Sequence, residues 1–212
     1  AAAGRVRRMV FVSSLHAVRT LSDDVLDENS PCRPDTPYGR SKLEAEQKLW
    51  AVSRRTGLDV VVVRPAPVYG PGGAGNLVAL LRWVRRGWLL PLAGLTNRRS
   101  LLYVGNLVDA LMACLDAAPA AGQTFLVSDA ETVSTSELIC RAAAAAGRRA
   151  RLWPAPLTLM QGAARLCGRS SSLERLVGSL AVDISRLRRT LSWNPAFTLD
   201  EGLRETARWL ET

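Results

Sequence analysis

The chain has 212 residues and a formal net charge of +9, from 28 Lys and Arg against 19 Asp and Glu. A hydrophobic content of 48% is enough to bury a core, which excludes disordered, collagen-like and disulfide-scaffold classes. No apolar run approaches the roughly 18 residues that a membrane span requires, and no charged-then-apolar leader is found, so we expect a cytoplasmic protein without a membrane span. The cysteines form no C-x-x-C pair, which is typical of reduced thiols in a cytosol.

The first third of the chain predicts a strand, a helix and a second strand. A short apolar strand is expected over 5–12. Thr36 suits a helix N-cap and Pro37 the first helical position, and we expect this helix to end at Gly57. The valine run at 59–63 is too dense for a half-exposed strand and predicts a buried parallel one. Together these elements predict a βαβ crossover.

The rest of the chain continues the alternation of helices and strands. We expect helices over 76–86, 107–115 and 134–146, and strands over 101–104 and 124–127. The residues 198–201 have the capping-box pattern of a helix N-terminus, ahead of an apolar face at 203, 207 and 210. The fold class that we expect is therefore α/β with a mainly parallel sheet.

A glycine-rich segment at 70–75 matches the dinucleotide-binding pattern G-x-G-x-x-G. That pattern also requires an acidic residue roughly 20 positions later, to bind the ribose hydroxyls. No Asp or Glu occurs from Val60 to Val108, and the first glycine follows the predicted strand too distantly for a tight turn. We therefore interpret the segment as a loop near a ligand and not as a dinucleotide-binding loop.

The same acid-free stretch is rich in arginine. Its arginines are Arg64, Arg82, Arg85, Arg86, Arg98 and Arg99. A surface of one sign favours an anionic partner, either a nucleic acid or a small ligand that carries phosphates. The alternative is an arginine-rich face that is simply solvated.

Tyr38 and Lys42 lie four residues apart at the start of the predicted helix. Positions i and i+4 share a helix face, so the phenol and the ammonium should project side by side. The ammonium and the positive end of the helix dipole would both favour a phenolate. Ser13 and Ser14 end the preceding strand, where ligands of open α/β sheets bind. These groups predict a site that removes a proton from an alcohol; the alternative is a surface helix that carries Tyr and Lys by chance.

Three segments of the chain resemble the extended short-chain dehydrogenase/reductases, and within them the NAD-dependent epimerase/dehydratase family. They are VFVSS at 10–14, PYGRSKLEAE at 37–46 and RPAPVYGPG at 64–72, and LSWNP at 191–195 with LDEGL at 199–203 is similar to the family's closing segment. The resemblance implies a Rossmann-like, mainly parallel sheet with a small mixed α/β substrate-binding lobe. The C-terminal part of the NAD-binding domain would comprise 1–69 and 100–130. The lobe and the C-terminal helices would comprise 70–99 and 131–212.

The resemblance also implies roles for individual residues. Tyr38 would be the general base, Lys42 would bind the nicotinamide ribose, and Ser14 rather than Ser13 would bind the reacting oxygen. The residues lining the nicotinamide of the cofactor NAD would be Pro65, Ala66 and Val68. Besides Ser14 and Tyr38, the nucleotide-sugar contacts would be Asn76, Leu90, Leu92 and Arg99. The resemblance implies a UDP-sugar as partner, with no nucleic acid and no metal, and an arginine suits the diphosphate of such a sugar.

The reaction implied is that of a UDP-hexose 4-epimerase acting through a 4-keto sugar. Family dehydratases place an Asp-Glu pair after the active-site hydroxyl residue, whereas Leu15 and His16 follow Ser14 here, which favours epimerisation or carbonyl reduction. We interpret His16 as an ordinary loop histidine. The alternatives are a 4-keto reductase of the same family and a non-catalytic Rossmann-like remnant that binds an anionic partner.

The family's first strand and its Gly-rich loop, which hold the NAD pyrophosphate, have no counterpart in the sequence. We therefore expect a fragment that is inactive alone and belongs to a homodimer when complete; the alternative is a natural truncation that cannot bind NAD tightly.

Overall fold

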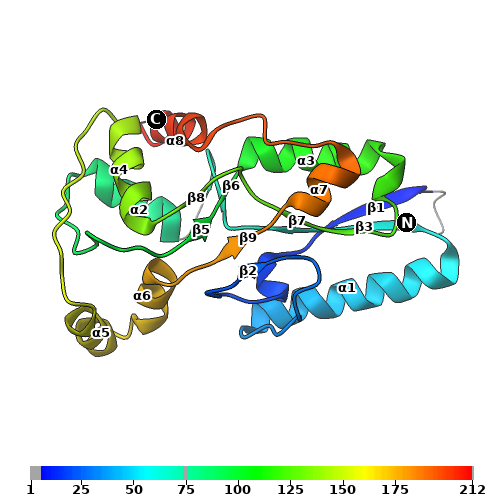
Figure 1. Ribbon diagram of the computed structural model, residues 1–212, viewed down its shortest axis with the longest axis horizontal. Helices are drawn as coiled ribbons and strands as arrows, with labels where there is room; N and C mark the ends of the chain where they lie inside the picture. Colours follow the sequence, from blue (N-terminus) through cyan, green and yellow to red (C-terminus); the bar gives the residue numbers. More distant parts are fainter. Residues whose placement is uncertain (1–5, 74–75, 212) are drawn as a thin grey trace.

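A three-stranded parallel sheet forms the centre of the computed structural model, which describes residues 6–73 and 76–211. Its strands, in the order β1-β3-β7, are β1 (Arg8–Val12), β3 (Asp59–Pro65) and β7 (Thr124–Val127) (Figure 1). The register pairs Val10 with Val61, and Val63 with Phe125. The strands predicted near these positions and their parallel arrangement are confirmed.

Helix α1 (Pro37–Thr56) connects β1 to β3 and completes the βαβ crossover. The Thr36 side chain accepts a hydrogen bond from the Gly39 amide at 3.0 Å, which caps the helix N-terminus. Gly57 ends the helix in the left-handed conformation, with φ of 70°, which a glycine adopts without a steric penalty. The start and end predicted for this helix are confirmed.

Both faces of β3 are covered by helices. Val60 and Val62 pack with Leu49 and Trp50 of α1. The alternate residues, Val61 and Val63, share a cluster with Ala110 and Cys114 of α3 (Val104–Asp116) on the opposite face. The valine run is dense because successive side chains of a strand point to opposite faces, and here both faces are buried.

Short two-stranded ladders accompany the central sheet. The parallel pairs are β2 (Val25–Leu26) with β9 (Ala181–Val182) and β4 (Val68–Tyr69) with β6 (Leu102–Tyr103), and the antiparallel pair is β5 (Arg99–Ser100) with β8 (Thr132–Val133). The 3₁₀ turns are η2 (Leu15–Ala17) and η3 (Ala118–Ala120). The expected α/β class with a mainly parallel sheet is confirmed.

The remaining helices lie mostly away from the central sheet (Figure 1). Their bounds are α2 (Asn76–Arg85), α4 (Thr135–Ala145), α5 (Leu157–Leu166), α6 (Ser170–Val177), α7 (Ser185–Leu191) and α8 (Leu199–Trp209). A second core contains Leu80 of α2, Leu138 of α4 and Leu203 of α8. Leu187 of α7 instead packs with Phe125 of the central sheet. The sequence prediction counted α7 with the lobe; the division into two parts itself stays a prediction.

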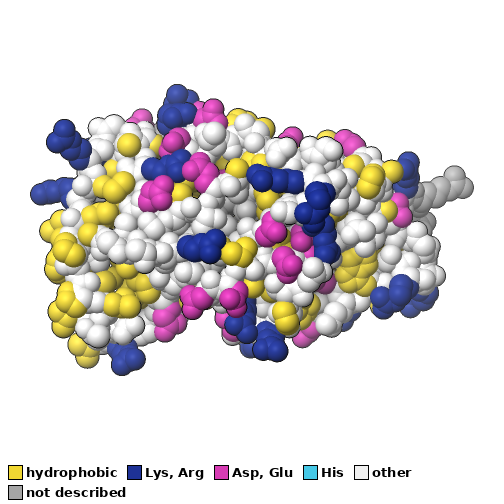
Figure 2. Space-filling model, viewed as in Figure 1, with side chains coloured by type: hydrophobic (Ala, Val, Ile, Leu, Met, Phe, Trp, Pro, Cys, Tyr) yellow, Lys and Arg dark blue, Asp and Glu magenta, His cyan; other side chains and the backbone are white. Residues whose placement is uncertain are grey.

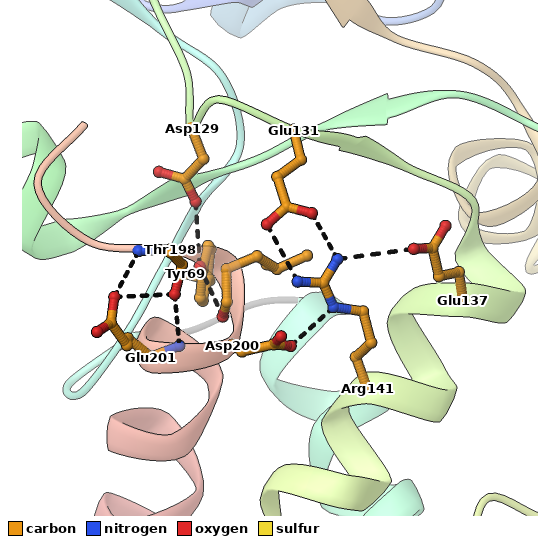
Figure 3. Close-up of polar contacts among 9 residues, drawn as sticks. Tyr69, Asp129, Glu131, Glu137, Arg141, Thr198, Asp200 and Glu201 are labelled. Atoms are coloured by element: carbon orange, nitrogen blue, oxygen red, sulfur yellow. Dashed lines mark hydrogen bonds and ion pairs between the residues drawn. The ribbon is translucent and has the colours of Figure 1, made fainter. Parts of the chain in front are cut away.

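Arg141 joins α4 to α8 and to the segment before β8 (Figure 3). Its guanidinium pairs with Glu131 at 2.6 Å and with Asp200 at 2.7 Å. Next to Asp200, Thr198 and Glu201 form the capping box that the sequence predicts at the start of α8. Arg141 lowers the pKa of both Glu131 and Asp200 by hydrogen bonding to their ionised forms.

A buried carboxylate, Asp129, ties β4, β6 and α3 together. It accepts hydrogen bonds from the Tyr69 hydroxyl at 3.0 Å (Figure 3), from the Tyr103 amide at 3.0 Å and from the Asn106 side chain at 2.8 Å. Burial raises the pKa of Asp129. Because a buried polar group is costly unless it is hydrogen-bonded, this network fixes the strand that precedes the glycine loop. Within the described ranges, no helix has the length and apolar character needed to cross a membrane.

Candidate active site

A cleft of about 460 Å³ opens at the carboxyl ends of β1 and β3. Its lining consists of Val12, Ser13, Ser14, His16, Tyr38, Lys42, Pro65, Ala66, Pro67, Val68 and Leu107. These residues come from the end of β1, the start of α1, the segment around β4 and the helix α3. The structure thus brings the predicted proton-abstracting groups into one cleft with the residues predicted to line the nicotinamide.

Tyr38 and Lys42 lie side by side on the first turns of α1. The Lys42 Nζ atom is 5.7 Å from the centroid of the Tyr38 ring. Lys42 also donates a hydrogen bond to the Val12 carbonyl at 3.0 Å, which anchors its ammonium at the end of β1. The Tyr38 side chain is accessible, with 52% of the residue exposed. A phenol beside an anchored cation and open to a ligand is suited to proton transfer.

The two serines after β1 differ in their surroundings. Ser13 is buried, and its hydroxyl donates to the carboxylate of Glu46. Ser14 is only half-buried, and its Oγ accepts a hydrogen bond from the His16 amide at 3.2 Å. The Ser14 hydroxyl can therefore still donate its own proton to a ligand, which supports the expected choice of Ser14 over Ser13.

His16 lines the cleft next to Tyr38, with its ring edge-on to the phenol ring and the centroids 5.9 Å apart. Burial is the main cause that lowers the pKa of His16, which favours the neutral imidazole. The sequence interpretation treated His16 as an ordinary loop residue. Its position two residues after Ser14 was a local signal that it could lie in the same cleft.

Glu46 and Arg64 form an ion pair at the base of the site. Arg64 Nε donates to Glu46 Oε1 at 3.0 Å and Nη2 donates to Oε2 at 2.6 Å, with the residues 7% and 2% exposed respectively. The charge of Arg64 is therefore neutralised by Glu46, and Arg64 does not belong to a free cationic surface. The sequence alone placed it among the arginines of such a surface. Sequence reasoning missed Glu46, although it follows Tyr38 and Lys42 at the same four-residue spacing on α1.

Of the residues predicted to contact the sugar nucleotide, only Ser14 and Tyr38 are among the described residues that line this cleft. Leu90 and Leu92 are buried in the second core. The Arg99 guanidinium donates to the carbonyls of Arg175 and Gly178, at the end of α6, and burial lowers its pKa. Asn76 begins α2, but its side chain is outside the described residues. The substrate roles of these residues stay predictions.

The lining of the cleft fits a flat ring with a sugar attached. Pro65, Ala66 and Leu107 offer an apolar wall, whereas Ser14 and Lys42 offer hydrogen-bond donors. Among residues 6–73 and 76–211, no group of three or more His, Cys, Asp or Glu is placed to hold a metal ion.

Comparison with known proteins identifies the family of the chain. The model of the NAD dependent epimerase/dehydratase family matches residues 1–128. The chain belongs to this family. The family predicted from the three sequence segments is thereby confirmed, and with it membership of an enzyme family.

Curated relatives of this epimerase/dehydratase chain include enzymes named for two kinds of substrate. The chain is 39% identical over 206 residues to UDP-glucose 4-epimerase of Vibrio cholerae, a match that covers 96% of this chain and 63% of the relative. It is 30% identical over 136 residues to N-acetyl-alpha-D-glucosaminyl-diphospho-ditrans,octacis-undecaprenol 4-epimerase of Escherichia coli O157:H7, covering 63% of this chain and 41% of the relative. The chain thus spans less than two thirds of the length of these relatives.

Solved structures with the same fold include two 4-epimerases. UDP-glucuronic acid 4-epimerase from Bacillus cereus, in complex with NAD, matches with a TM-score of 0.78 at 16% identity, over 99% of this chain and 63% of that one. UDP-glucose 4-epimerase from Thermotoga maritima, with UDP-glucose, matches with a TM-score of 0.73 at 21% identity, over 99% of this chain and 65% of that one. At these identities the likeness establishes the Rossmann-like fold of this epimerase/dehydratase chain.

Proposed function

We propose that this chain provides the proton-transfer site of an NAD-dependent sugar-nucleotide 4-epimerase. The observation that carries the proposal is the convergence of Ser14, Tyr38 and Lys42 in one cleft at the carboxyl ends of two parallel strands. The Vibrio cholerae relative named UDP-glucose 4-epimerase supports the same reaction class. Both curated relatives described above are named for a sugar linked through a diphosphate, so a UDP-hexose is the first substrate to test.

The residues of the cleft fit the nicotinamide end of NAD. Pro65, Ala66 and Val68 would hold the ring, and Lys42 would donate to the ribose hydroxyls. When bound, NAD accepts a hydride from the sugar carbon and later returns it. The protein's own contribution is to place the sugar hydroxyl against its proton acceptor and to exclude water from the apolar side of the cleft.

Tyr38 would take the proton of the C4 hydroxyl as the sugar is oxidised to the 4-keto form. The Lys42 ammonium, held by the Val12 carbonyl, would stabilise the phenolate, and Ser14 would donate a hydrogen bond to the C4 oxygen. In the second half of the reaction the keto sugar would present its other face to the nicotinamide. Tyr38 would then return the proton to the same oxygen. Inversion at C4 then needs no further acid or base from the chain.

The lining of the described cleft contains no Asp or Glu. Elimination of water from a keto sugar needs a second acid and base, so this lining supports epimerisation or carbonyl reduction over dehydration. The reductase remains the alternative within the family, because it would use the same three side chains and differ only in net consumption of NADH. Homodimerisation of the whole protein also stays a prediction.

The test is turnover by the protein that contains this chain at its full length. With NAD and UDP-glucose we expect formation of UDP-galactose, and Tyr38→Phe should lower kcat by roughly 10²–10⁴-fold, the contribution of a positioned general base. Tyr103→Phe is the matched control, because Tyr103 lies outside the cleft, and its kcat should stay near that of the parent.

Unchanged turnover in Tyr38→Phe would overturn the mechanism. Stoichiometric oxidation of NADH with a 4-keto sugar, without epimerisation, would identify the reductase. Absence of both activities, together with nucleic-acid binding that weakens steeply with salt, would favour the non-catalytic remnant.

A further inference from the structure

One end of the molecule exposes large apolar side chains. They are Trp88, Leu89, Trp153, Leu157, Leu159 and Leu166, which we call the apolar patch. Leu159 is 69% exposed and Leu166 is 92% exposed. Figure 2 shows hydrophobic side chains gathered at the left edge of the molecule, over α5 and the segment that leads into it. Exposed apolar side chains gathered in this way mark a site of interaction.

The apolar patch is continuous across two parts of the chain. The Leu90 amide donates to the Arg151 carbonyl at 2.8 Å, and the Trp153 amide donates to the Leu90 carbonyl at 3.0 Å. These bonds hold the segment of Trp88 and Leu89 beside that of Trp153. A mainly apolar cavity of about 510 Å³ also lies between α2, α5 and α6, and its lining includes Ala163 and Ala164 of α5.

Helix α5 is unusual for a helix in water. All of α5 is described, and it buries no residue. Its sequence LTLMQGAARL carries a single charge, that of Arg165. Met160 packs against the second core, whereas Leu157, Leu159 and Leu166 of the same helix stay exposed. Because exposed leucines gain little from folding in water, we expect this apolar side to be covered when the protein functions.

The charges around the apolar patch are almost all positive. Residues 138–173 contain no Asp or Glu. The exposed arginines of this stretch are Arg148, Arg149, Arg151, Arg165 and Arg169, which we call the arginine rim. Acidic residues at its edge are Glu211, in a hollow with Arg86 and Arg148, and the exposed Glu174 of α6. A second copy of this surface would bring two arginine rims together, whereas an anionic surface would neutralise them.

We propose that this end of the molecule docks on an anionic lipid bilayer. The leucines of α5 enter the boundary between headgroups and acyl chains, and the arginine rim binds lipid phosphates. Trp88 and Trp153 lie at the level of the headgroups, where the indole ring is favoured. The attachment is peripheral, since no helix of the described residues can span the bilayer. It is independent of the reaction proposed above, because the cleft of Tyr38 is lined by other residues.

The test is sedimentation of the full-length protein with vesicles, at physiological ionic strength. We expect binding to vesicles that contain phosphatidylglycerol and not to vesicles of phosphatidylcholine alone. Arg165→Gln with Arg169→Gln should lower the partition coefficient by about 30-fold, because each arginine near an anionic surface contributes a factor of roughly five. Leu159→Ser with Leu166→Ser should lower it by at least about tenfold.

Matched controls come from the opposite part of the molecule. Val108→Ser with Met112→Ser removes two exposed apolar side chains of α3, and Arg54→Gln with Arg55→Gln removes two exposed charges at the end of α1. Both pairs should bind vesicles as the parent does. Circular dichroism of each variant confirms that it is folded.

Binding confined to anionic vesicles, lost in the two patch variants and kept in the controls, supports the proposal. No binding, equal binding to neutral vesicles, or equal loss in controls and patch variants overturns it. Self-association that disappears in Leu159→Ser with Leu166→Ser, without vesicle binding, also overturns it and assigns the surface to a second copy of the chain.

Discussion

Glu46 and Arg64 join α1 to β3 through a buried bidentate ion pair beneath the cleft. The hydroxyl of Ser13, at the end of β1, donates to the same carboxylate. Because Tyr38, Lys42 and Glu46 follow one another at four-residue intervals on α1, a contact that holds Glu46 also sets the rotation of the helix at Tyr38. Glu46 is thus a positioning residue for the site.

Removing Glu46 should be strongly destabilising. Glu46→Ala leaves the Arg64 charge buried without its partner, and we expect the free energy of unfolding to fall by about 3–5 kcal/mol. Urea denaturation followed by circular dichroism measures the change. Glu44→Ala, at an exposed position of the same helix, is the control and should change stability by less than about 0.5 kcal/mol. Equal stability of the two variants would show that the ion pair contributes nothing.

Gly39 permits the close approach of α1 to η2. A Cβ atom at this position would collide with the His16 carbonyl oxygen and lie 3.1 Å from the Pro34 side chain. We expect Gly39→Ala to lower the free energy of unfolding by about 1–3 kcal/mol, the range for overpacking, and to reduce turnover by moving Tyr38 away from Ser14.

The control for Gly39 is Gly162→Ala in α5, where an added Cβ meets nothing within 4 Å. That substitution should stabilise the protein by about 0.5–1 kcal/mol, because alanine favours a helix interior over glycine. The steric explanation fails if both alanine variants change stability in the same direction.

The Arg141 network predicts a dependence of stability on pH. Arg141 lowers the folded-state pKa of Glu131 and Asp200 below their usual values of 4.5 and 3.8. Their contribution is therefore fully present above pH 4.5 and is lost as the pH falls through the lower folded-state values. Arg141→Gln should cost about 1 kcal/mol at pH 7, discounted for solvent exposure, and the difference from the parent should shrink in acid.

Thermal denaturation from pH 7 to pH 3 tests this dependence. Arg208→Gln is the control, because the Arg208–Glu205 pair, with side chains 71% and 46% exposed, lies in the same α8 but makes no contact with Arg141 among the described pairs. A pH-independent difference between Arg141→Gln and the parent would contradict the prediction.

The four cysteines should differ in reactivity. All lie in the described part of the chain as free thiols, and burial raises the pKa of Cys114 to about 11. At pH 8 we expect Cys140 and Cys167, which are exposed, to react with Ellman's reagent at once, and Cys114 to react only on unfolding. Cys114→Ser should remove the slow phase; persistence of that phase would assign it to Cys32.

The crossover that carries the site was predictable because its signals are local. Thr36 and Gly57 mark the two ends of α1, and the consecutive valines of β3 predict a strand that is covered on both faces. The i, i+4 spacing of Tyr38 and Lys42 likewise needs only the helix to place both side chains in one cleft.

Other features depend on contacts that no local pattern records. Arg64 was counted as a free cation because its partner, Glu46, lies outside the acid-free stretch. Arg99 binds backbone carbonyls, which every residue possesses. Apart from β6, which lies within the strand predicted at 101–104, the two-residue strands were missed. For example, β2 and β9 pair across most of the chain, and neither is long enough to show a periodicity.

The polar groups of the cleft all come from residues 12–68. Partners so near in sequence close a short loop, which costs little chain entropy and favours early formation during folding. The groups that we propose exchange the proton are therefore assembled by one compact stretch of polypeptide. If the proposal holds, later parts of the chain can change in sequence without disturbing these groups.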